Sequence, residues 1–157
     1  ELGFTNTQIA QVVKVYGLAA TIFGTFLGGG MVAKWGMYRV LMLTGVLHMF
    51  TNLLLVVMAG RGTDTGFLAL CVISENLTAG MGTAAFVAYL SSLCRVQYTA
   101  TQYALLSALA SVARTMISTA SGAAAENLGW PLFFAVSSLM AIPSLVLLWW
   151  INRRYRL

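Results

Sequence analysis

Five long apolar segments with short connections constrain this chain more than any other feature. They cover approximately residues 7–33, 38–60, 66–94, 99–125 and 130–152. The hydrocarbon core of a bilayer is about 30 Å thick and needs about 20 apolar residues of α-helix to cross it, so each segment is long enough. Short connections make consecutive helices antiparallel. We therefore predict an all-α membrane protein with five transmembrane helices.

Composition argues against a water-soluble domain. Hydrophobic residues make up 59% of the 157 residues and charged residues 8%, whereas soluble domains carry about 25% charge. The net charge of +5 would suit nucleic acid, but the basic residues stand at helix ends, so we expect no nucleic-acid partner. The sequence has no metal-ligand spacing, no phosphate loop and no Ser–His–Asp set. We expect neither a metal nor a cofactor, and no enzymatic activity.

The distribution of charge predicts how the helices are oriented. One side of the predicted bundle holds six basic residues, namely Lys34, Arg39, Arg95, Arg153, Arg154 and Arg156. The other side holds one, Arg61, with the acids Glu1, Asp64 and Glu126. Positive residues gather on the cytoplasmic side of membrane proteins, so the C-terminus is predicted to be cytoplasmic. The chain opens at Glu1 on the outside without an initiator Met, and we expect a fragment that lacks at least one upstream helix.

Three charged residues lie inside the predicted spans: Lys14, Glu75 and Arg114. At a rise of about 1.5 Å per residue they lie roughly 10, 14 and 17 Å from the external helix ends. A lone charge at the centre of a membrane helix costs at least about 3 kcal/mol, so such residues are functional candidates by default. Two cations and one anion at similar depth can pair with one another or line a water-filled cavity.

Each of these charges shares a helix face with polar or small residues, at 100° per residue. The Arg114 face carries Tyr103, Ser107, Ser111, Ser118 and Ser121, the Glu75 face carries Ala79, Gly82, Phe86 and Tyr89, and the Lys14 face carries Gly17, Thr21, Thr25 and Gly28. Hydroxyls and aromatic rings beside a charge suit a sugar or peptide path. We predict that the solute-binding residues are Lys14, Arg114, Ser107, Ser111, Tyr103 and Tyr89. The alternative is that the Ser and Thr hydroxyls form hydrogen bonds between helices.

Glu75 is the predicted proton-coupling residue. A rocking motion that changes its distance from Lys14 or Arg114 would change how readily the carboxylate takes a proton. The alternative is a permanent ion pair that holds helices together. His48, with Thr44 and Asn52 one turn to either side, can act as a proton relay. Its other interpretation, which we favour, is a neutral imidazole in an interhelical Thr–His–Asn hydrogen-bond set.

Two stretches, Glu75–Ala88 and Ala100–Ala110, together with Lys14, closely resemble the muropeptide permeases of the major facilitator superfamily and the related peptide/acetyl-coenzyme A transporter family. The similarity runs along essentially the whole chain and is strongest over 75–114. The segment Gly29–Gly36 resembles the cytoplasmic signature loop of the superfamily, with Ala33 where that loop normally carries an acid.

The resemblance implies that the chain is part of the C-terminal half of such a transporter, covering its eighth to twelfth helices. Lys14, Glu75 and Arg114 would then lie on cavity-lining helices, while segments 38–60 and 130–152 would stand outside the cavity. The implied function is proton-driven import of anhydro-muropeptides across the bacterial inner membrane, together with an N-terminal half that this chain lacks. The alternatives are a transporter of acetyl-coenzyme A or another solute, and a non-transporting membrane assembly module.

Overall fold

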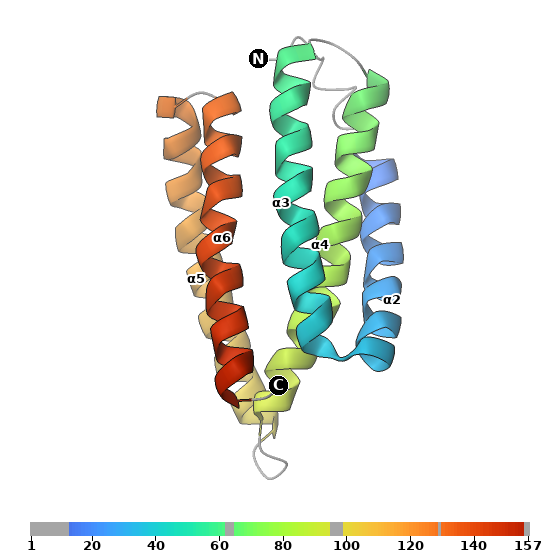
Figure 1. The fold of residues 1–157 in the computed structure, drawn as a ribbon, viewed down its shortest axis with the longest axis vertical. Coiled ribbons are helices and arrows are strands. Elements are labelled where there is room, and N and C mark those ends of the chain that lie inside the picture. The colour runs from blue at the N-terminus through green and yellow to red at the C-terminus, as the bar shows by residue number, and fades with distance from the viewer. Residues whose placement is uncertain (1–12, 62–64, 95–98, 129, 156–157) are drawn as a thin grey trace.

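The computed structural model describes residues 13–61, 65–94, 99–128 and 130–155. Within these residues the chain forms long helices, drawn in Figure 1. They are the π-helical turn η1 (Val13–Gly17) and the α-helices α2 (Leu18–Trp35), α3 (Met37–Arg61), α4 (Thr65–Leu93), α5 (Thr99–Leu128) and α6 (Trp130–Tyr155). The all-α prediction is confirmed.

Four parts of these helices are long and apolar enough to cross a membrane: Lys14–Trp35, Met37–Met58, Gly66–Leu93 and Val136–Arg154. Helix α5 is not among them, because its serines, threonines and Arg114 lower its hydropathy. Its 30 residues are nevertheless long enough to span a bilayer. A helix whose polar stripe faces a cavity and whose other side faces lipid would have this mixed character.

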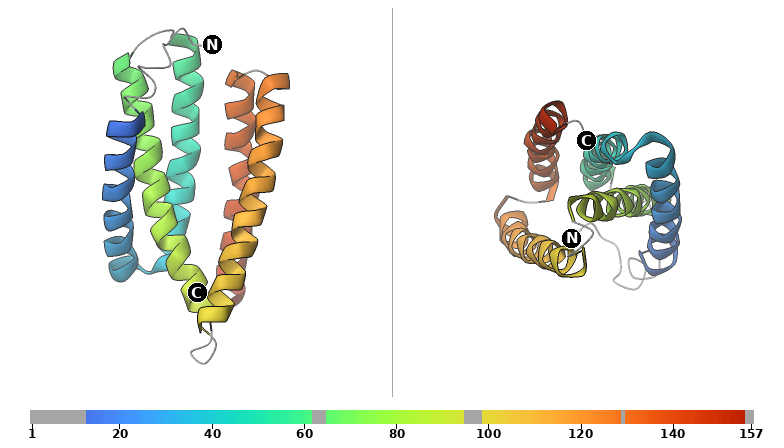
Figure 2. Two further views of the ribbon diagram at one scale, coloured as in Figure 1. Left: turned by 180° about the vertical axis from the view of Figure 1, so that it is seen from behind. Right: turned by 90° about the horizontal axis from the view of Figure 1, so that it is seen from below.

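Helix α4 lies in the middle of the bundle, as the end-on view in Figure 2 shows. It contacts η1, α2, α3 and α5, and its contact with α2 is the most extensive in the described part of the chain. Helix α6 packs along α3, whereas α5 touches α4 and α6 sparsely. In Figure 1 the α5–α6 pair therefore stands to one side of α2, α3 and α4.

Glycines let α2 and α4 approach closely. A Cβ at Gly28 would lie 2.6 Å from the Cα of Met81, and one at Gly24 would meet the backbone carbonyl of Leu77. From the other side, a Cβ at Gly80 would meet the backbone of α2. Helices in lipid associate through such van der Waals packing of small residues, because lipid tails are as apolar as the side chains. The α2–α4 pair is therefore the firmest contact of the fold.

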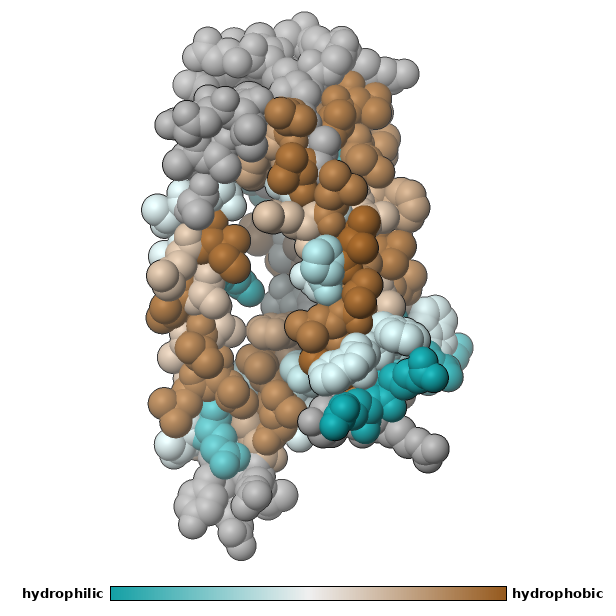
Figure 3. Space-filling model, turned by 60° about the vertical axis from the view of Figure 1, so that its left-hand side comes forward, coloured by the Kyte–Doolittle hydropathy of each residue, from teal (hydrophilic) through white to brown (hydrophobic). Residues whose placement is uncertain are grey.

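A cluster of buried apolar residues lies between α3 and α4, at the end of the bundle away from Gly36. It consists of Leu55, Met58, Leu68, Cys71 and Val72, while Val40, Ala85 and Leu90 are buried nearer the Gly36 end. Most large apolar side chains instead lie on the surface, including those of Phe26, Leu109 and Met140. Figure 3 shows this broad hydrophobic surface, with hydrophilic side chains gathered near one end of the face in view. Such a surface is suited to contact with lipid.

Candidate functional site

A cavity of about 340 Å³ lies between α3, α4 and α5. It contains one fully charged side chain, that of Arg114, together with an imidazole, three threonine hydroxyls and an aromatic ring. The lining residues are Leu41, Thr44, Gly45 and His48 of α3, Thr78, Ala79, Gly82, Thr83 and Phe86 of α4, and Arg114 of α5. An apolar wall with a few convergent polar groups is typical of a ligand site.

Arg114 is exposed to this cavity. No ion pair or side-chain hydrogen bond joins its guanidinium to another residue in the described part of the chain. A guanidinium is always charged, and its planar fork of donors matches a carboxylate or a phosphate. The unpaired donors of Arg114 are therefore free to bind an anionic group of a solute.

The threonines leave acceptor capacity in the cavity. The hydroxyl of Thr44 donates to the Leu41 carbonyl at 3.1 Å, and that of Thr83 donates to the Ala79 carbonyl at 2.8 Å. A hydroxyl has one hydrogen to donate and two lone pairs to accept. Both residues can therefore accept hydrogen bonds from the hydroxyl or amide groups of a solute.

His48 occupies a different place from the one that we favoured. In the described structure no hydrogen bond joins His48 to Thr44 or Asn52, and the Thr44 hydroxyl donates within its own helix to Leu41. The His48 side chain is exposed and lines the cavity. Helix α3 also contributes Leu41, Thr44 and Gly45 to this cavity, while the implied position of segment 38–60 outside the central cavity of a complete transporter stays a prediction. Since α5 packs sparsely on α4, the cavity between them stays open to the small-residue face of α3 at Thr44 and Gly45.

Of the predicted binding residues, Arg114 alone lines this cavity. Ser111, Ser107 and Tyr103 follow it at one-turn steps along α5 toward the helix start, and Tyr89 lies one turn beyond Phe86 on α4. Both series run from the cavity toward the end of the bundle that carries Gly36. The hydroxyls of Ser111 and Ser107 donate to carbonyls of their own helix, at 2.8 and 3.0 Å. They form no hydrogen bond between helices in the described structure, so their lone pairs stay available.

Glu75 and Lys14 lie nearer the other end of the bundle. Glu75 is partly buried on α4, one turn before Ala79. Lys14 is exposed in η1, which packs on α4, with Gly17 against the side chain of Asn76. All three charged residues are described, and no ion pair joins any two of them. Their predicted roles in binding and coupling remain predictions.

Sequence reasoning missed Thr78, Thr83 and the structural role of Asn76. The two threonines are i+3 and i+8 from Glu75, so a wider arc around that acid would have included them. Asn76 contacts α2, because the Thr21 hydroxyl, which also donates to the Gly17 carbonyl at 2.9 Å, lies 3.1 Å from its Oδ1. An amide inside an apolar span is the signal that could have identified it.

Comparison with known proteins places this geometry in context. The sequence profile of the Major Facilitator Superfamily matches residues 1–157. The chain is 34% identical to the putative transporter AmpG 4 of Rickettsia felis, over 98% of this chain and 37% of that protein. It is 37% identical to the anhydromuropeptide permease of Escherichia coli, over 94% of this chain and 30% of that protein. The chain thus spans about a third of the length of these curated relatives.

Proposed function

This chain belongs to the Major Facilitator Superfamily, and we propose that it forms five helices of the C-terminal half of a transporter that imports anhydro-muropeptides. These solutes are a disaccharide, N-acetylglucosamine linked to anhydro-N-acetylmuramic acid, with an attached peptide. The observation that carries the proposal is the unpaired Arg114 in a cavity lined by hydroxyls and an aromatic ring. The permease name of the Escherichia coli relative supports the choice of solute.

The cavity chemistry fits this class of solute part by part. A peptide carboxylate matches the guanidinium fork of Arg114. Sugar hydroxyls and amides can donate to Thr44 and Thr83, whose own hydrogens are already engaged. The ring of Phe86 offers an apolar face to a sugar ring. The hydroxyls that continue along α5 from Arg114 would extend the path toward the Gly36 end.

The volume of the cavity supports a shared site. At about 340 Å³ it is at the small end for a drug-sized ligand, and a disaccharide with a peptide is larger. Binding sites in secondary transporters lie at the interface between structural repeats, near the bilayer midplane. We propose that an N-terminal half supplies the rest of the site. In this arrangement the Gly36 end faces the cytoplasm, and the protein lies in the bacterial inner membrane.

Two other functions are less well supported. Acetyl-coenzyme A carries several phosphate charges, and the cavity offers one permanent cation, Arg114, in its described lining. A non-transporting assembly module would have no use for a charged residue exposed in a cavity and left unpaired, because the burial of charge in a membrane is costly. Import of a singly or doubly charged glycopeptide therefore remains the preferred function.

Competitive uptake tests the proposal. Membrane vesicles that contain the complete transporter would be supplied with radiolabelled anhydro-muropeptide and an excess of unlabelled competitor. We expect unlabelled muropeptide to abolish the accumulation of label, and acetyl-coenzyme A to leave it unchanged. Equal competition by acetyl-coenzyme A would favour the rival solute. Vesicles that accumulate no label, from protein that is correctly inserted, would favour the assembly module.

A further inference from the structure

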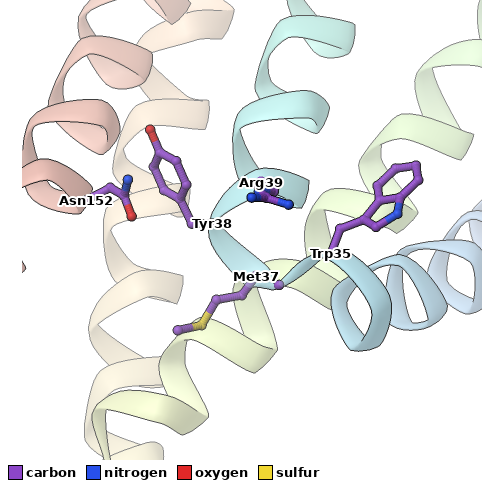
Figure 4. A pocket seen from close by; sticks show the side chains of 6 residues that line it. Trp35, Met37, Tyr38, Arg39 and Asn152 are labelled. Atoms are coloured by element: carbon purple, nitrogen blue, oxygen red, sulfur yellow. The ribbon is translucent and has the colours of Figure 1, made fainter. Parts of the chain in front are cut away.

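A second cavity lies at the end of the bundle that carries Gly36, beside the turn from α2 into α3 and the last part of α6. It has a volume of about 540 Å³, and its lining is Trp35, Gly36, Met37, Tyr38, Arg39 and Asn152. Figure 4 shows Tyr38 and Asn152 on one side, with Arg39 between them and Trp35. Gly36 allows the sharp turn from α2 into α3 with a φ of 85°, a conformation that favours glycine. This turn brings Arg39 to the mouth of the cavity.

An apolar groove continues from this cavity along α3 and α6. Its volume is about 300 Å³, and it is lined by Met42 and Met49 of α3 and by Ile142, Leu145, Val146 and Trp149 of α6. Met42 lies one turn from Tyr38, and Trp149 lies one turn from Asn152, so the two spaces follow one another along the α3–α6 contact. Ile142, Val146 and Trp149 are all about half exposed. The groove is therefore open to the surface of the bundle.

The charge around the cavity is positive. Arg39 is exposed and has no ion-pair partner in the described structure, and Lys34 lies in the last turn of α2. Arg153 and Arg154, in the last turn of α6, stack over Trp149 and Trp150 at 5.4 and 5.6 Å. The acids within described helices lie elsewhere, with Glu75 in the body of α4 and Glu126 at the far end of α5. This end of the bundle therefore attracts anions.

We propose that this cavity and groove together bind one anionic phospholipid. Its phosphodiester lies at Arg39 and accepts hydrogen bonds from the side chains of Tyr38 and Asn152. One acyl chain lies in the groove between Met42 and Val146. A free phosphate would explain the polar cavity but not the adjoining apolar groove, and a neutral lipid would explain the groove but not the unpaired cation. Basic pockets between membrane helices at the cytoplasmic interface suit anionic headgroups.

Native mass spectrometry of the complete purified protein tests the proposal. The protein is titrated with phosphatidylglycerol and with phosphatidylcholine of the same acyl chains. We expect one saturable site that prefers phosphatidylglycerol. Arg39→Gln should weaken phosphatidylglycerol binding about five-fold, as expected for one basic residue at a membrane surface. Lys34→Gln removes the same charge one residue outside the lining and should change binding less than about two-fold.

A second pair of variants tests the groove. Val146→Trp fills it and should weaken both lipids equally, whereas Leu147→Trp adds the same side chain to the neighbouring exposed position and should weaken neither. Because binding is measured as the lipid-bound fraction of the folded protein in each spectrum, a partial loss of folded protein does not alter the result. Arg39→Lys keeps the charge and should retain most of the preference.

Three results would overturn the proposal. Equal effects of Arg39→Gln and Lys34→Gln would indicate diffuse attraction to a basic surface. Displacement of phosphatidylglycerol by glycerol 3-phosphate, at concentrations similar to those of the lipid, would indicate a phosphate site that needs no acyl chain. The absence of any saturable lipid site in the complete protein would indicate that another part of the protein covers the groove. None of these results depends on the transported solute.

Discussion

The hydroxyl of Thr21 on α2 lies 3.1 Å from Oδ1 of Asn76 on α4. The amide nitrogen of Asn76 donates to the Val72 carbonyl of its own helix at 2.8 Å, which fixes the amide with its oxygen toward α2. This polar contact joins the two helices that pack most closely, and it lies next to Glu75 in the sequence. It therefore holds α4 in a set rotation about its axis at the position of the predicted proton-coupling residue.

Removal of this contact should destabilise the protein measurably. Thr21→Val keeps the shape of the side chain and removes the hydroxyl, whose one hydrogen is shared between Asn76 and the Gly17 carbonyl of its own helix at 2.9 Å. We expect the substitution to lower the free energy of unfolding by about 0.5–1.5 kcal/mol. Thr25→Val is the matched control, because Thr25 is exposed and donates to the Thr21 carbonyl within its own helix. Unfolding of the complete protein in detergent provides the measurement. Equal stability of the two variants would show that the bond between the helices contributes nothing.

Substitution at Gly28 should be costly, and the same substitution one residue later should not be. Gly28→Ala places a methyl group against the Met81 backbone, which cannot move aside as a flexible side chain would, and we expect a loss of about 1–3 kcal/mol. Gly29→Ala meets nothing within 4 Å and should be neutral or slightly stabilising. Thermal unfolding of both variants in detergent compares them directly. A harmless Gly28→Ala would show that α2 and α4 are not held this closely.

The orientation of the helices can be measured by labelling from each side of the membrane. With Cys71 and Cys94 replaced by alanine, a cysteine is placed at Asp64 or at Arg95, both of which lie outside the described residues. The excess of basic residues at the Gly36 end predicts that an impermeant thiol reagent labels Asp64→Cys from outside and Arg95→Cys from the cytoplasm. The reverse pattern would invert the proposed topology.

Glu75→Gln separates proton coupling from solute binding. If Glu75 carries the coupled proton, the variant should lose proton-driven accumulation of muropeptide and retain exchange of solute across the membrane. His48→Gln is the comparison, because the imidazole of His48 lines the cavity and histidine is a common proton relay. Unchanged pH dependence of uptake in Glu75→Gln would assign the proton to His48 or to another part of the transporter.

The length and hydropathy of the segments predicted the helices well, because bilayer thickness sets the length of a span and charge or glycine marks its ends. The α4 face was also predicted in part, since Ala79, Gly82 and Phe86 do line the cavity. The place of His48 could not be predicted, because periodicity gives the faces of a helix but not which neighbour each face meets.

The face of Lys14 was uncertain for a different reason. The Lys14 face was counted at 100° per residue, but Lys14 lies in a π-helical turn over Val13–Gly17. Hydrogen bonds from i to i+5 add a residue to the turn. The direction in which Lys14 points around the helix axis therefore differs from the one that 100° per residue gives. The sequence has no signal that marks such a turn. The relation of Lys14 to Thr21 and Thr25 therefore had to come from the structure.

The central claim is that Arg114 binds an anionic group of the solute, and uptake by its variants tests this most directly. In the complete transporter, Arg114→Ala should abolish muropeptide uptake. Arg114→Lys keeps the charge but loses the planar fork and should lower kcat/KM about ten-fold. Thr115→Val, which alters an exposed neighbour outside the cavity lining, should transport normally. Normal uptake by Arg114→Ala at normal expression would contradict the claim and make Arg114 a structural residue.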